Sequence, residues 1–476
     1  MVRANRLTAL LCFALIHTAP ASAQNKEDVN REARAIFQQL IEINTTDSVG
    51  NVTTAAEAVA KRFRDAGFPE QDVIVAGPDE RKKNLVVRLH GTGKRRPVLF
   101  IGHLDVVEAR REDWSTDPFQ FLEKDGFFYG RGTRDMKEGD AILVTTLLRL
   151  KRENFQPDRD LILALTADEE GGDFNGVAWL VKEHRPWIDA EYCINLDGGE
   201  FERLRGKQML AGLQASEKVY NDFQLETTNP GGHSSIPGPE NAIYELAAAL
   251  TRVQNFTFPV HINELTREYF RQSAKLAGGP LAADLRGAAQ VPPDPAAIQH
   301  LSAVPYYNSL LRTTCVATML SGGHAANALP QTARANVNCR IFPGEDPQEI
   351  RKTLERVVAD SKVKITSVTE KTADGQPIPI VAVPPSPLLP DLITALNQTL
   401  STMWPGLPVV PTMSTGATDG KYLRIAGIPT YGIACMFFDM EDDRSHGKDE
   451  RVGVADFYDG IEFCYRFMKT LSSASS

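Results

Sequence analysis

The chain has 476 residues, of which 42% are hydrophobic and 24% are charged, and its formal net charge is −9. This composition excludes collagen-like, low-complexity and wholly disordered chains, and the length predicts two or three domains with ample cores. The sequence shows no basic stripe, so we expect no nucleic-acid partner.

Residues 1–23 have the pattern of a secretory signal peptide. Arg3 and Arg6 precede a mostly apolar run at 7–16, and Ala23 closes a small-residue cleavage pattern. This apolar run is too short to span a bilayer, which needs about 20 residues, so we expect no stable membrane anchor. The sequence therefore predicts a secreted or periplasmic protein, cleaved after Ala23.

The chain that follows has an odd number of cysteines. They are Cys193, Cys315, Cys339, Cys435 and Cys464. Their wide spacing, without a CxxC pair, indicates neither a disulfide framework nor a zinc finger. Most lie in apolar stretches, which favours buried, unreactive thiols. The pattern leaves open whether any two of them are paired.

Apolar strands alternate with helices in the first part of the chain. Helical periodicity predicts helices at 27–43 and 52–66. After these we expect strands at 84–89, 97–101, 161–166 and 192–196, with helices at 139–152 and 176–184 between them. Such alternation is typical of an α/β domain with a largely parallel sheet and helices on both faces.

The pattern changes near residue 215. Half-exposed strands and helices follow, and the stretch 255–308 is polar, helical and interrupted by prolines. The first pattern resumes towards the C-terminus. We therefore predict an α/β domain formed by residues 24–214 and 376–476, interrupted by an inserted α+β domain at 215–375.

Imidazole and carboxylate side chains follow three of the predicted strands. His103 and Asp105 come after one strand, Glu169 and Glu170 after the next, and Asp197 after the third. In open parallel sheets, ligands bind at the carboxyl ends of the strands. Each residue alone has an ordinary explanation, such as a helix cap or a solvated surface. Together they are the donors that a hydrolytic zinc pair needs.

These residues belong to a longer series of motifs. In chain order it reads His103-x-Asp105, Gly130-x-Gly132-x-x-Asp135-Met136-Lys137, Glu169-Glu170-Gly171, Asp197-Gly198-Gly199, Gly231-Gly232-His233-Ser234-Ser235 and Ser445-His446. The series resembles the M20 family of metallopeptidases, which includes carboxypeptidases, dipeptidases and aminoacylase-type deacylases. The resemblance covers almost the whole chain after residue 23. It implies that the inserted domain is a lid and dimerisation domain, and hence a possible homodimer.

The resemblance implies two metal ions held by five residues. His103 and Asp197 would bind one zinc ion, and Glu170 and His446 would bind the other. Asp135 would bridge both ions, and its peptide bond with the next residue is often cis in this family. Cobalt or manganese could replace zinc, because sites of imidazole and carboxylate accept several divalent ions.

Three further residues receive catalytic roles from the resemblance. Glu169 would be the general base and acid, taking a proton from the attacking water and returning it to the leaving amine. Asp105 would orient the ring of His103, as residues behind metal-bound histidines do. His233 would stabilise the oxyanion. In the family it reaches the site when the lid closes, commonly from the partner subunit.

Substrate-binding residues are carried over in the same way. Arg340 resembles the arginine that holds a substrate carboxylate, a task suited to a guanidinium group. Asn327 resembles a lid asparagine near the substrate, and Gly416 a glycine whose backbone faces the substrate. The sequence departs from the family pattern at Glu108 and Glu138, and both departures affect the expected shape of the pocket rather than the metal ligands.

The sequence thus predicts an exported dizinc hydrolase that cleaves an amide bond beside a free carboxylate, as a carboxypeptidase or dipeptidase. An N-acyl-amino-acid amidohydrolase on the same scaffold is the alternative. A non-catalytic binding protein is a remote third reading, because such a protein would be expected to lack a ligand or the base, and all six residues are present.

Overall fold

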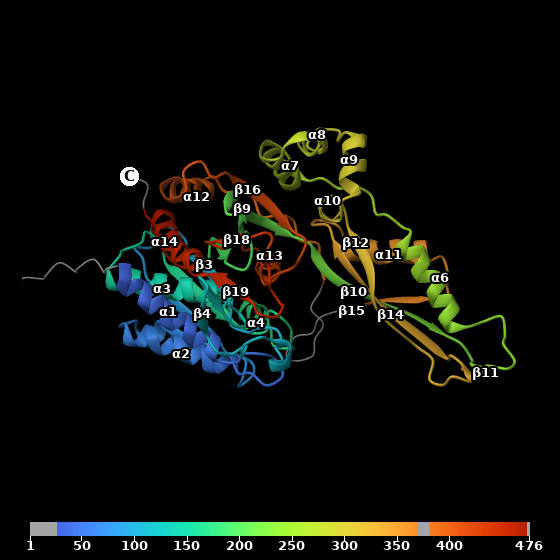
Figure 1. The fold of residues 1–476 in the computed structure, drawn as a ribbon. Helices are drawn as coiled ribbons and strands as arrows, with labels where there is room; N and C mark the ends of the chain where they lie inside the picture. The colour runs from blue at the N-terminus through green and yellow to red at the C-terminus, as the bar shows by residue number, and fades with distance from the viewer. Residues whose placement is uncertain (1–25, 369–379, 474–476) are drawn as a thin grey trace, which may run out of the picture.

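The computed structural model describes residues 26–368 and 380–473, so the predicted signal peptide lies outside the described residues. The largest element is a ten-stranded sheet in the order β1-β2-β6-β3-β7-β17-β9-β8-β18, with β16 paired to β9 (Figure 1). Its strands are β1 (Val73–Ala76), β2 (Asn84–Leu89), β3 (Val98–His103), β6 (Leu161–Thr166), β7 (Tyr192–Asn195), β8 (Phe201–Leu204), β9 (Lys207–Glu217), β16 (Val409–Ser414), β17 (Thr430–Gly432) and β18 (Phe437–Asp439). The central run β6-β3-β7-β17 is parallel throughout.

Helices cover both faces of this sheet. Because successive side chains of a strand point to opposite faces, Val98 and Phe100 of β3 join one core cluster, and Leu99 and Ile101 join another. The first face carries α1 (Lys26–Glu42), α2 (Val52–Asp65), α3 (Lys137–Arg152), α12 (Pro390–Met403) and α14 (Val454–Leu471); the second carries α4 (Gly176–Glu183), α5 (Arg185–Ile188) and α13 (Gly420–Ile425). This arrangement confirms the predicted fold class.

A second, four-stranded sheet has the order β12-β14-β10-β15. It consists of β12 (Thr314–Gly322), β14 (Thr332–Ile341), β10 (Val219–Thr228) and β15 (Lys364–Val368). With α6 (Ala242–Gln254) and α11 (Pro347–Val358) it encloses a core of its own, which includes Phe223, Leu246 and Leu354. Figure 1 shows this lobe beside the large one, with the short pair β11 (Gly232–His233) and β13 (Ala328–Leu329) at its far tip.

The helical stretch within the insertion packs differently from the sheet around it. It forms α7 (Glu264–Leu276), α8 (Gly279–Ala288), α9 (Pro295–Ser302) and α10 (Pro305–Leu311). Leu265, Phe270, Leu285 and Leu301 of these helices belong to the core cluster of the large sheet. The insertion therefore contacts the large lobe through buried apolar side chains as well as through its connecting strands.

A three-stranded sheet in the order β19-β5-β4 belongs to the large lobe, and its Phe128 and Val452 lie in the core of that lobe. It is formed by β19 (Arg451–Gly453), β5 (Phe127–Tyr129) and β4 (Leu122–Lys124), and it brings the chain after residue 446 next to the chain before Gly130. Among the described residues, no helix combines the length and the apolar character that a membrane crossing needs.

Two of the cysteines correct the expectation of unreactive thiols. Cys315 and Cys339 lie directly opposite each other on β12 and β14 and form a disulfide. The sequence signal was too weak to show this pair, because the two residues become neighbours only when the strands align. Cys193, Cys435 and Cys464 are free and buried, as expected.

Replacing both paired cysteines by serine is expected to lower the free energy of unfolding by about 3 kcal/mol, because the disulfide closes a loop of 24 residues in the unfolded chain. Urea unfolding with and without reductant would measure the difference. Reductant should bring the unmodified protein to the stability of the double variant and leave that variant unchanged. Equal stability of both proteins without reductant would contradict the prediction.

Candidate metal centre

The first group of site residues lies where neighbouring parallel strands end. His103 is the last residue of β3, and its register partner is Thr166, the last residue of β6. On the other side of β3, Ile101 pairs with Asn195 at the end of β7. The turns that carry Glu169, Glu170 and Asp197 follow these ends directly, so the sheet brings all of these side chains to one edge.

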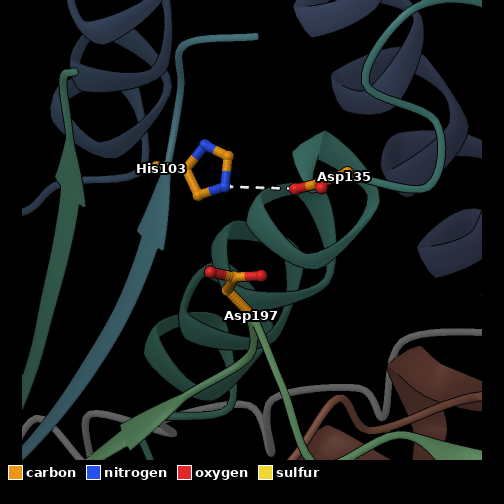
Figure 2. A group of neighbouring side chains, drawn as sticks. All are labelled: His103, Asp135 and Asp197. Carbon is orange, nitrogen blue, oxygen red and sulfur yellow. Dashed lines mark ion pairs between the residues drawn. The ribbon is translucent and has the colours of Figure 1, made fainter. Parts of the chain in front are cut away.

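Five side chains meet there in two groups that share Asp135. His103, Asp135 and Asp197 form one group, and Asp135, Glu170 and His446 form the other; within each, the potential ligand atoms lie within 4.8 Å of one another. Figure 2 shows the first group, with His103 at the end of its strand and Asp135 at the start of α3. These are the five residues, in the same two groups, that the family resemblance implies.

Asp135 directs one carboxylate oxygen to each histidine. Its Oδ1 lies 3.2 Å from Nε2 of His103, and its Oδ2 lies 3.1 Å from Nε2 of His446. His446 Nε2 is also 3.0 Å from Oε1 of Glu170. The Asp135–Met136 peptide bond is cis, as the resemblance implies.

The ring of His103 presents its second nitrogen to the group. Nδ1 lies 3.1 Å from the backbone oxygen of Asp105, so the proton belongs on Nδ1. Nε2 is also buried; it makes no well-aligned hydrogen bond, and the nearest carboxylate oxygen is Oδ1 of Asp135 at 3.2 Å. A buried imidazole nitrogen grouped with two carboxylates, those of Asp135 and Asp197, fits a divalent metal ion, so the residues present suit the group that the fold implies.

Contrary to what the resemblance implies, the carboxylate of Asp105 does not hydrogen-bond the ring of His103 but the turn that carries the two glutamates. It is 3.7 Å from Nδ1 of His103, too far for a good hydrogen bond, and instead accepts from the backbone N–H groups of Glu169 at 3.2 Å and Glu170 at 3.0 Å. Asp105 therefore holds the ring through its carbonyl oxygen and holds the turn with the two glutamates through its side chain.

Other groups fix the same turn, and sequence reasoning missed them. Lys82 is buried, and its ammonium group lies 2.5 Å from the carboxylate of Asp168, the residue immediately before Glu169. Asn175 donates to the backbone oxygen of Asp168 at 3.0 Å and to the carboxylate of Asp419 at 2.7 Å. The one available signal was the position of Asp419, three residues after Gly416 in a polar turn. Lys82 had no signal, because it approaches from a distant segment.

The crowding of these acids raises several pKa values. Burial raises the pKa of Glu169 well above its ordinary value, and the nearby Asp197 adds to the effect. Burial and Asp135 raise the pKa of Asp197 to about 8. Hydrogen bonds with Asp135 and Glu170 raise the pKa of the His446 ring to about 10. A raised pKa means that the carboxylates hold protons, which reduce the repulsion between them. A bound divalent cation would reduce the same repulsion.

The two departures from the family pattern lie outside both groups. Glu108 accepts hydrogen bonds from the backbone and hydroxyl groups of Ser48 at 3.0 and 2.9 Å. Glu138 is buried, and burial raises its pKa well above the ordinary value. Neither residue contributes to the candidate ligand groups.

The substrate-binding candidates lie at two separate ends of the four-stranded sheet. Arg340 is at the end near the large lobe, with its guanidinium carbon 4.7 Å from the ring centre of Tyr220. Gly416 is near the same end, where its N–H donates to Ser414 at the end of β16. His233 and Asn327 lie together at the far tip, where the backbone N–H of Ser234 donates to the carbonyl oxygen of Asn327.

These two ends are far apart. The register runs from the pair Tyr220–Arg340 to the pair Thr228–Thr332, about 26 Å at about 3.3 Å per residue, and His233 lies beyond it. The ring of His233 is exposed, and its Nδ1 lies 2.7 Å from the hydroxyl of Ser235. One chain in this conformation therefore places Arg340 and Gly416 near the junction with the large lobe, and His233 and Asn327 at the opposite end of the sheet.

Known proteins resemble this chain over most of its length. It is 27% identical to human N-fatty-acyl-amino acid synthase/hydrolase PM20D1 over 79% of this chain and 74% of the relative. It is 28% identical to a probable carboxypeptidase S-like protein of Dictyostelium discoideum over 79% of this chain and 71% of the relative.

Solved structures share the fold. An M20 family metallo-carboxypeptidase from Sulfolobus solfataricus matches with a TM-score of 0.68 at 15% identity, over 93% of this chain and 99% of that chain. A dinuclear metal binding peptidase from the M20 family of Bacillus subtilis matches with a TM-score of 0.57 at 11% identity, over 94% and 98%. The family model of peptidase family M20/M25/M40 matches residues 99–470 of this chain. The chain therefore belongs to this family and is a metallohydrolase.

Proposed function

We propose that the chain is an exported dizinc hydrolase that cleaves an amide bond beside a free carboxylate, as a carboxypeptidase or dipeptidase. The observation that carries the proposal is the pair of three-residue groups joined by Asp135. Each group combines imidazole and carboxylate donors, which suit zinc and also cobalt or manganese. The proposal of export rests on the sequence of residues 1–23 alone.

In this proposal His103, Asp135 and Asp197 hold one ion, and Asp135, Glu170 and His446 hold the other. Bound divalent ions supply Lewis acidity to the substrate carbonyl and to a water molecule. Glu169 belongs to neither group, and it lies on the turn that Asp105 and Lys82 hold in place. A carboxylate so placed and with a raised pKa accepts a proton from the water and returns it to the leaving amine.

Arg340 is proposed to bind the free carboxylate of the substrate. A guanidinium group pairs with a carboxylate through two parallel hydrogen bonds. Arg340 lies near the end of β14 that adjoins the large lobe, and its guanidinium carbon lies 4.7 Å from the ring centre of Tyr220, a cation–π contact that restricts the side chain. Gly416 is proposed to present its backbone to the same substrate.

A panel of dipeptides and N-acyl amino acids tests this assignment. Amidation of the substrate carboxylate is expected to lower kcat/KM by at least about tenfold, because one charge-assisted pair is worth about 1.5–3 kcal/mol. Arg340→Ala should lower kcat/KM for the free acid by a similar factor and leave the amide unaffected. If the unmodified protein and Arg340→Ala cleave the free acid and the amide with the same kcat/KM, Arg340 does not bind the carboxylate.

The second candidate is hydrolysis of N-acyl amino acids, which also cleaves an amide bond beside a free carboxylate. It is supported by the likeness to human PM20D1, an N-fatty-acyl-amino acid synthase/hydrolase. The same panel separates the two: higher kcat/KM for long-chain N-acyl amino acids than for any dipeptide favours the second candidate.

A homodimer through the inserted domain, residues 215–375, is part of the proposal. Strand β12 is at the edge of the four-stranded sheet. Its side chains Val316, Met319 and Leu320 are 60%, 71% and 71% exposed. A long exposed edge strand with apolar side chains is a surface for pairing with another chain. Such a partner could bring its own His233 and Asn327 to the site, which this chain does not do by itself.

A further inference from the structure

Glu450 is a buried carboxylate four residues after His446, and the proposed function gives it no role. Its side chain is fully buried. Oε1 accepts hydrogen bonds from the backbone N–H groups of Arg134 at 2.7 Å and Asp135 at 3.1 Å. Oε2 pairs with the guanidinium of Arg131 at 2.5 Å. Glu450 thus satisfies three donors within the turn that ends in Asp135.

Arg131 extends this contact to the loop that carries His446. It is also buried, and its Nη2 donates to the backbone oxygens of His446 and Glu108, both at 3.4 Å. Its guanidinium carbon lies 5.0 Å from the ring centre of Trp114. The backbone oxygen of Glu450 accepts from Gly130 at 3.2 Å. The two loops are therefore joined through both the side chain and the backbone of Glu450.

These bonds have a direct geometric consequence for the candidate site. Asp135 and His446 are brought within 3.1 Å of each other although they come from opposite ends of the sequence. Asp135, Glu170 and Asp197 are close enough to repel one another, so the turn with Asp135 would move outward if nothing held it. The Glu450 side chain holds the backbone of that turn, so the carboxylate of Asp135 stays free to bind a metal ion.

We propose that Glu450, acting through Arg131 and the backbone of Asp135, is the positioning residue that sets the distance between Asp135 and His446 for the ion they share. The inference rests on the proposed metal ligands and adds a residue outside them. Groups that orient metal ligands typically change metal affinity by about 10–100-fold when they are replaced.

The test is metal affinity of the full-length protein, stripped of metal and titrated with zinc against a chromogenic chelator. Glu450→Gln keeps the shape and one acceptor but removes the charge that pairs with Arg131. It is expected to weaken the more loosely bound of the two zinc ions by about 10–100-fold. Thermal unfolding of the stripped proteins measures the separate effect on stability.

Asp456→Asn is the matched control. Asp456 pairs with Arg203 through both carboxylate oxygens, is mostly buried and touches none of the proposed ligands. It should lower the unfolding temperature without weakening either zinc ion. Unchanged zinc affinity in Glu450→Gln, or an equal loss in Asp456→Asn, would overturn the proposal.

Arg131→Lys covers the case in which Glu450→Gln does not fold. Lysine keeps the charge beside Glu450 but cannot also reach His446 with a second nitrogen of a planar group. A tenfold or greater loss of affinity for one ion is expected, and wild-type affinity would overturn the proposal. Failure of the unmodified protein to bind zinc would instead contradict the proposed function itself.

Discussion

Replacing Glu169 by glutamine is expected to lower kcat by about 10²–10⁴-fold, the usual contribution of a general acid–base group. The amide has the same shape but cannot take a proton from water at neutral pH. Because Glu169 belongs to neither three-residue group, the variant should still bind two metal ions per chain. Steady-state kinetics and metal analysis of the same preparation provide both measurements.

Glu202→Gln is a suitable control for that experiment. Burial also raises the pKa of Glu202, to about 7, but the residue lies on β8 outside the candidate ligand groups. Its replacement should leave kcat unchanged. Wild-type kcat in Glu169→Gln would show that another group transfers the proton.

Replacing His233 by alanine is expected to lower kcat by about 10²–10³-fold, which is the typical cost of losing one oxyanion donor. The residue is exposed at the tip of the inserted domain, so its loss should not change the stability of the chain. A large effect on kcat without an effect on the unfolding temperature would place His233 at the reaction centre of the assembled enzyme.

Mixed dimers would show which chain supplies His233. Chains with Glu169→Gln and chains with His233→Ala, each carrying a different tag, can be co-expressed and purified as a mixed dimer. If His233 acts on the partner's site, one site is complete and about half the wild-type activity returns. If the residue acts within its own chain, no site is complete, and the mixed dimer is as inactive as its parents.

The fold could largely be predicted because strands and helices of the large lobe differ in their apolar patterns. The expected strand at 161–166 is β6, and the expected helix at 139–152 is α3 with two more residues at its start. The candidate site could be predicted for a related reason. His103, Glu170 and Asp197 follow strands that are neighbours in a parallel sheet, so the order of strand ends placed them together.

What the sequence did not reveal depends on tertiary contacts. The packing of Leu265 and Phe270 against the large lobe follows from how the insertion folds back, which periodicity does not describe. The Cys315–Cys339 pair depends on strand register. Glu450 resembled any acid in a polar loop, and only the structure shows that it accepts from the backbone of Asp135.

The central claim is that this chain holds two divalent ions between His103, Asp135, Glu170, Asp197 and His446. Metal analysis of protein that has been stripped, reloaded with zinc and desalted tests it most directly. The account predicts two zinc ions per chain in the unmodified protein and a loss of both in Asp135→Asn, because Asp135 belongs to both groups. Fewer than one ion per chain in the unmodified protein, or two ions retained in Asp135→Asn, would contradict it.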